Sequence, residues 1–96
     1  MSAALAESLA ERRLQLPGGV LGPDGRCHRM VRVRELTGAD EEVLADTGAA
    51  GASLVTRFLA RVIVEIEGLQ RRVDEALVWD MLVGDRDYLL LRLRQI

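Results

Sequence analysis

The sequence predicts an α+β fold in which a two-stranded β-hairpin packs on a bundle of three or four helices. Alternating apolar and polar residues within 12–36 indicate the strands, and apolar residues spaced three and four apart within 52–67 indicate a core helix. The 96 residues are 49% hydrophobic and 29% charged, which is typical of one globular domain. We expect a single domain over 1–96, with an N-terminal helix in 1–11, the hairpin in 12–36 and a helical part in 37–96.

The first expected element is a short helix over residues 3–11. Ser2 is a suitable N-cap, and Leu5 and Leu9 lie four apart on one face. Two large apolar residues supply little core, so we expect this helix to be weak or to order only against a partner.

The hairpin follows. The stretch "MVRVREL" places Val31 and Val33 on one side of a strand and Arg32 and Arg34 on the other. The sequence GPDG at residues 22–25 is a turn signal, because proline fixes φ and glycine permits positive φ. Two strands alone are marginally stable in water, so we expect their apolar face to lie on helices.

Two helices are predicted next. Thr37 and Asp40 form an acidic variant of the capping box, and the helix should run to about residue 46, where "TGAAGA" breaks it. A second helix over 52–67 should end at Gly68. Its core-facing stripe consists of Val55, Phe58, Leu59, Val62, Ile63 and Ile66.

The C-terminal part predicts two more helices. The first covers about 72–83 and should stop at Gly84, with apolar residues crowding its end. Asp85 should cap the last helix, and Asp87 should complement its dipole. The apolar face of this helix is too wide for one core, which is typical of an interaction surface, although complete burial in this domain is an equal alternative. The candidate partner-binding residues are Tyr88, Leu89, Leu90, Leu91, Leu93 and Ile96, together with Arg32 and Arg34.

Composition narrows the function classes. The net charge of −2 gives no global attraction for nucleic acid, although all 13 basic residues are arginine. No apolar run approaches the roughly 18 residues of a membrane span, and the N-terminus lacks the pattern of a signal peptide. A single cysteine excludes an internal disulfide. We therefore expect a cytoplasmic protein.

Candidate reactive groups are sparse. Cys27 and His28 are adjacent, whereas a structural zinc site needs four ligands at wider spacing. Asp80, Asp85 and Asp87 match no cation-binding loop, and capping or an ion pair of Asp80 with Arg86 or another arginine explains them. Three serines with one histidine give no nucleophilic motif, and no phosphate-binding loop is present. We expect neither an enzyme nor a cofactor.

Arginines 26, 29, 32 and 34 form a basic stripe on the hairpin. Single-strand nucleic-acid binding would need interleaved aromatic residues, which the hairpin lacks. A solvated strand face is the first interpretation, and an interface with an acidic partner is the second.

Two motifs carry a resemblance to a known family. The sequence "LTGADEE", residues 36–42, is followed by "FLARVIVEIEGL" at 58–69 and "VGDRDYLLLRLR" at 83–94. In this order and spacing they resemble the T-even-type phage baseplate protein family, which also occurs in contractile injection systems, the phage-tail-like particles of bacteria. The resemblance covers about residues 14–96.

This resemblance implies a non-enzymatic structural or assembly component of the baseplate or hub of a contractile tail. The implied partners are other baseplate, hub or tape-measure proteins, with a homo-oligomer as a further option. Its location would be the bacterial cytoplasm during assembly and then, for a structural component, the particle. One alternative is a tail assembly chaperone that is absent from the mature particle. A small DNA-associated regulator is the alternative from another class.

Overall fold

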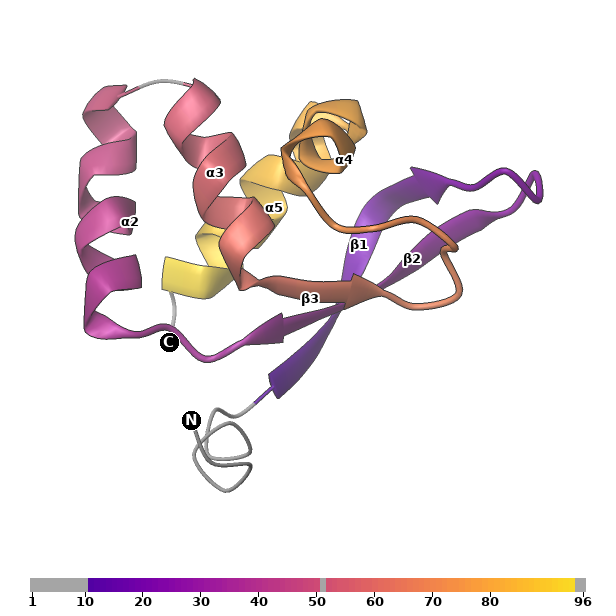
Figure 1. Cartoon of the computed structure of the whole chain (residues 1–96), viewed down its shortest axis with the longest axis horizontal. Coiled ribbons are helices and arrows are strands. Elements are labelled where there is room, and N and C mark those ends of the chain that lie inside the picture. The colour runs from indigo at the N-terminus through magenta and orange to yellow at the C-terminus, as the bar shows by residue number, and fades with distance from the viewer. Residues whose placement is uncertain (1–10, 51, 95–96) are drawn as a thin grey trace.

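The computed structural model describes residues 11–50 and 52–94, which form an antiparallel three-stranded sheet and four helices (Figure 1). The α+β class is therefore confirmed, whereas the predicted sheet lacked one strand. The elements are β1 (Glu11–Leu21), β2 (Cys27–Arg34), α2 (Gly38–Ala50), α3 (Ala52–Val62), β3 (Ile63–Ile66), α4 (Glu75–Asp80) and α5 (Val83–Arg94).

β1 and β2 form the predicted antiparallel hairpin. Its tip is a turn in which the Gly25 amide donates to the Gly22 carbonyl over 3.0 Å. Gly25 has a φ of +77°, a conformation that favours glycine. A helix was expected over residues 3–11, but Glu11 is the first residue of β1, so the prediction is wrong at that position. The remaining residues of the expected helix lie outside the described residues.

β3 is the strand that the sequence analysis missed. Residues 63–66 were expected to continue the helix over 52–67, but α3 ends at Val62 and the chain pairs with β2. Val31 lies opposite Ile66, and Val33 lies opposite Ile63. The run "VIVEI" at 62–66 contains four β-branched residues, which restrict χ1 in a helix and pack well on a sheet. Pairing of residues 63–66 with the free edge of β2 is therefore more favourable than continuing the helix that the spacing of the apolar residues predicted.

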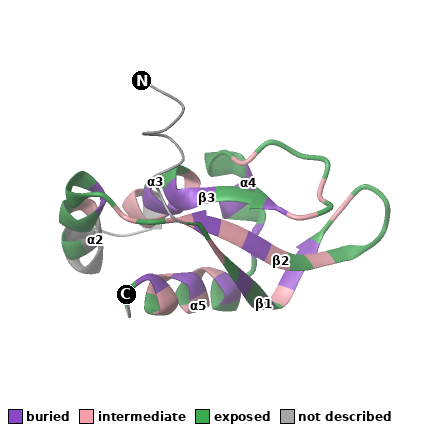
Figure 2. Ribbon diagram, turned by 90° about the horizontal axis from the view of Figure 1, so that it is seen from below, coloured by how far each residue is buried: buried purple, intermediate pink, exposed green. Residues whose placement is uncertain are grey.

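One face of the sheet carries the core. Helices α3, α4 and α5 cover this face, and the opposite face of the sheet points to solvent (Figures 1 and 2). β2 is the central strand, and its Val31 and Val33 are buried, as the alternation predicted. Further buried core residues come from β1, α3, β3, α4, the link after α4, and α5: Leu14, Leu16, Val20, Phe58, Leu59, Val62, Ile63, Ile66, Leu77, Val78, Met81, Leu89 and Leu93.

The capping box of α2 is confirmed. The Thr37 amide donates to the Asp40 carboxylate over 2.8 Å, and the Asp40 amide donates to the Thr37 hydroxyl over 3.3 Å. The helix runs to Ala50 rather than ending near residue 46. Alanine is the best helix former, and the expected break contains several alanines.

The boundaries of the last two helices also differ from expectation. α4 begins after Asp74, whose side chain caps it by accepting from the Leu77 amide over 2.9 Å. Gly84 was expected to stop this helix but lies inside α5, because the chain turns earlier, at Met81. Asp85 was expected to cap α5, yet it lies in the first turn and binds elsewhere.

Candidate protein-binding surface

The leucine-rich last helix divides between core and surface. Leu89 and Leu93 are fully buried in the core of this chain, and Tyr88 and Leu90 are partly buried against it. Of the predicted leucine set, only Leu91 is strongly exposed, at 57%. Residue 96, the last of the predicted set, lies outside the described residues. The helix therefore offers a partner much less leucine than its sequence suggests.

Tyr88 is engaged by its own helix. The Arg92 guanidinium lies 5.7 Å from the centroid of the Tyr88 ring. Arg92 also donates to the Tyr88 hydroxyl over 3.0 Å. This i, i+4 pair fixes the ring on the helix surface.

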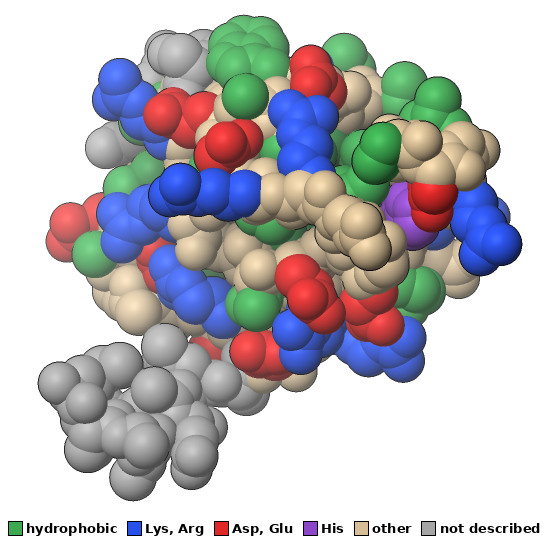
Figure 3. Space-filling model, turned by 45° about the vertical axis from the view of Figure 1, so that its right-hand side comes forward, with side chains coloured by type: hydrophobic (Ala, Val, Ile, Leu, Met, Phe, Trp, Pro, Cys, Tyr) green, Lys and Arg blue, Asp and Glu red, His purple; other side chains and the backbone are tan. Residues whose placement is uncertain are grey.

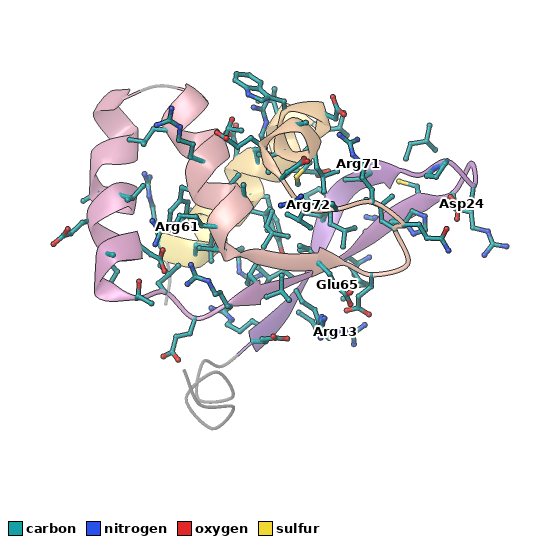
Figure 4. All side chains as sticks on the ribbon, viewed as in Figure 1. Arg13, Asp24, Arg61, Glu65, Arg71 and Arg72 are labelled. Carbon is teal, nitrogen blue, oxygen red and sulfur yellow. The ribbon has the colours of Figure 1, made fainter. Side chains whose placement is uncertain are left out.

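Two arginines on the outer face of the sheet are paired with acids of this chain. Arg32 lies 3.2 Å from Glu11 and 3.0 Å from Glu65 on the outer face of the sheet. On the same face, Arg13 makes two hydrogen bonds to Glu67, at 2.7 and 3.0 Å. Figure 4 shows Arg13 and Glu65 below the sheet, on the side away from the helices. Of the basic stripe predicted from the sequence, Arg32 thus pairs with carboxylates, whereas Arg29 donates to the backbone carbonyls of Leu16 and Pro17.

Arg34 points to the start of α2 and binds the buried Asp40. Its two terminal nitrogens lie 2.6 and 3.2 Å from the Asp40 carboxylate, and Arg61 reaches the same group at 3.1 Å. The hydrogen bonds from Arg34, together with those from Thr37, hold the pKa of Asp40 well below its usual range, despite burial. Two arginines and a capping box therefore meet at one carboxylate, which joins α2 and α3 to the end of β2.

Cys27 and His28 point to different places, as neighbours on a strand do. The Cys27 thiol donates to the Gly18 carbonyl over 3.1 Å, whereas His28 Nε2 lies 3.2 Å from Asp24. His28 lines a pocket of about 100 Å³ with Pro23, Asp24, Gly68 and Gln70. Among the described residues, no group of three or more His, Cys, Asp or Glu side chains could hold a metal ion.

An exposed apolar patch lies where α4 ends and α5 begins. It consists of Trp79, Leu82 and Val83, which are 51%, 57% and 62% exposed. Arg86 joins them, because its guanidinium lies 5.5 Å from the centroid of the Trp79 ring. Figure 3 shows hydrophobic side chains gathered along the upper rim of the molecule, the side on which α4 lies in Figure 1. We call these four residues the junction patch.

The junction patch stands on a rigid base. Asp85 is 1% exposed, and its two carboxylate oxygens accept from the amides of Gly18 and Gly19, each over 2.8 Å. These glycines lie where the register of β1 shifts against β2. A Cβ at Gly18 would lie 2.5 Å from the Leu82 side chain, so the absence of a side chain there lets Leu82 pack on the strand. One buried carboxylate therefore fixes the start of α5 on β1.

Trp79 and Leu82 were expected within a helix over 72–83 and were not among the predicted partner-binding residues. A signal was present in "WDMLV", residues 79–83, where three apolar residues follow one another before a glycine. A helix buries one stripe, so three consecutive apolar residues cannot all face a core. Trp and Arg are among the residues that are enriched in protein-binding hot spots.

The fold and this surface define a small α+β domain with a candidate protein-binding patch. No protein-family model, curated protein or solved structure matches the chain. Within the described ranges, no helix has the length and apolar character needed to cross a membrane.

Proposed function

We propose that this chain is a non-enzymatic structural or assembly component of the baseplate or hub of a contractile phage tail or phage-tail-like injection system. It acts through contacts with other baseplate, hub or tape-measure proteins. The resemblance of residues 36–42 and 83–94 to baseplate proteins supports this proposal. The chemistry of the outer strand face supports it over DNA binding, because Arg32 and Arg34 already contact carboxylates.

The observation that carries the proposal is the position of the junction patch. Val83 and Arg86 belong to the segment "VGDRDYLLLRLR", and Leu82 directly precedes it. Within that segment Leu89 and Leu93 build the core, Asp85 anchors the helix, and Val83 and Arg86 remain at the surface. One of the two segments that together carry the resemblance thus combines an anchored helix start with exposed side chains.

Quantitative mass spectrometry of purified mature particles, compared with the lysate that produced them, tests this function. A fixed stoichiometric amount in the particles identifies a structural component. Presence in tail-assembly intermediates with absence from mature particles identifies an assembly factor such as a chaperone. Absence from both refutes the proposal.

A matched pair of variants links the function to the surface. Leu82 and Leu91 are equally exposed, at 57%, but only Leu82 belongs to the junction patch. We expect Leu82→Glu to remove the chain from particles or intermediates and Leu91→Glu to leave it there. If Leu91→Glu alone removes the chain, the interface lies on the last helix instead. If neither variant removes the chain, neither leucine belongs to the interface.

A further inference from the structure

Arg86 is a cation in the junction patch that has no ion pair with any side chain that the structure describes. Its Nε atom is buried and has no hydrogen-bond partner among these residues. Its guanidinium contacts the Trp79 ring, which supplies apolar surface and a weak cation–π attraction. The partly buried Arg86 guanidinium therefore lies against Trp79 without an ion pair to a described acid.

Two acids near this arginine are bound to other groups, and a third lies at a different angle on the helix. Asp80 lies 2.8 Å from Arg71, and Asp85 is occupied by two strand amides. Asp87 is exposed one position further along α5, about 100° around a helix of 3.6 residues per turn. Arg86 thus makes no direct ion pair with the described acids at the surface where a partner would bind.

We propose that the junction patch binds a segment of a second, different protein in which a carboxylate is flanked by apolar side chains. The apolar side chains would cover Trp79, Leu82 and Val83, and the carboxylate would pair with Arg86. Planar guanidinium groups bind carboxylates through two parallel hydrogen bonds, and this geometry gives specificity. The inference rests on the proposed function and adds to it the chemistry of the partner.

A second copy of this chain fits the patch less well. A two-fold symmetric contact centred on this patch would place two Arg86 guanidiniums close together. Their repulsion in a partly desolvated interface disfavours that arrangement. The charge of the patch therefore selects a partner of complementary, acidic character.

The test uses the full chain in cells that make the particle, with the photo-crosslinking residue benzoylphenylalanine in place of Leu82. The matched control carries it in place of Leu91, which has the same exposure. We expect the Leu82 position to crosslink to another protein within one helical turn of an Asp or Glu, and the Leu91 position not to reach that segment. Crosslinks to a second copy, to a segment without a carboxylate, or to nothing would overturn the inference.

Charge exchange then tests the ion pair itself. We expect Arg86→Glu to lower the crosslink yield about tenfold or more, as loss of an interfacial charge pair does, and Arg86→Gln to lower it less. Replacing the partner's carboxylate by arginine should restore the yield with Arg86→Glu, and this rescue excludes simple unfolding. Unchanged yield with both variants would refute the pairing.

The same data separate this inference from the proposed function. A crosslink to an acidic segment of a protein that is not a tail protein, with the chain absent from particles and intermediates, would refute only the function. A chain that is present in particles but does not crosslink through position 82 would refute only the inference.

Discussion

Replacing Asp85 by asparagine perturbs the contact that fixes α5 on β1. The aspartate offers two oxygens to the Gly18 and Gly19 amides, at 2.8 Å each, and is 1% exposed. Asparagine has nearly the same shape but only one acceptor oxygen. Its NH₂ group would face the second amide, so one strand N–H would lose its acceptor and meet another donor.

The expected destabilisation follows from these two bonds. A hydrogen bond to a charged group contributes about 1.5–3 kcal/mol, and a neutral one about 1 kcal/mol. Asp85→Asn loses one charged bond and weakens the other, which gives a loss of about 2–4 kcal/mol in the free energy of unfolding. For a domain of this size, that loss lowers Tm by roughly 10–25 °C.

Urea unfolding followed by circular dichroism measures this loss. The midpoint should fall while the m-value stays constant, because the surface exposed on unfolding is unchanged. Asp87→Asn is the matched control, since Asp87 is exposed in the same helical turn, and it should change stability by about 0.5 kcal/mol or less. Equal stability of Asp85→Asn and Asp87→Asn would refute the anchoring role.

Three further predictions concern the rest of the fold. Gly19→Ala should lower the free energy of urea unfolding by about 1–3 kcal/mol, because Gly19 has a φ of +98°. Arg34 holds the pKa of Asp40 below its unfolded value, so the stability from Asp40 is complete above about pH 5 and is lost as pH falls towards the folded pKa. Arg34→Gln should therefore make stability decline less steeply in acid unfolding experiments, and an unchanged slope would contradict this. Leu89→Ala should lower stability by about 2–5 kcal/mol and the exposed Leu91→Ala by much less, and equal losses in urea would contradict the division of the last helix.

Several parts of the structure could be predicted from the sequence because they depend on residues close together in the chain. The capping box joins Thr37 and Asp40, three residues apart, and the hairpin turn joins Gly22 and Gly25. The alternation that buries Val31 and Val33 also follows from local strand geometry. Asp80 pairs with an arginine, as expected, although the partner is Arg71 rather than Arg86.

Other features required contacts between distant parts of the chain. The stretch 63–66 has helical spacing with the residues before it, and it becomes a strand because β2 offers an edge about 30 residues earlier in the sequence.

The candidate site itself was decided by tertiary structure. From the sequence Asp85 was a helix cap, whereas in the fold it binds amides 66 and 67 residues away. The same packing buries Leu89 and Leu93 and leaves Leu82 and Val83 exposed, although all four are aliphatic residues within a short stretch of sequence. The hydrophobicity of a side chain determines whether it can enter a core. Whether it does so depends on which part of the helix surface the neighbouring elements cover. The sequence alone therefore determined the α+β class, the capping box of α2 and the hairpin turn, and the packing of α4 and α5 on β1 decided which apolar side chains remain available to a partner.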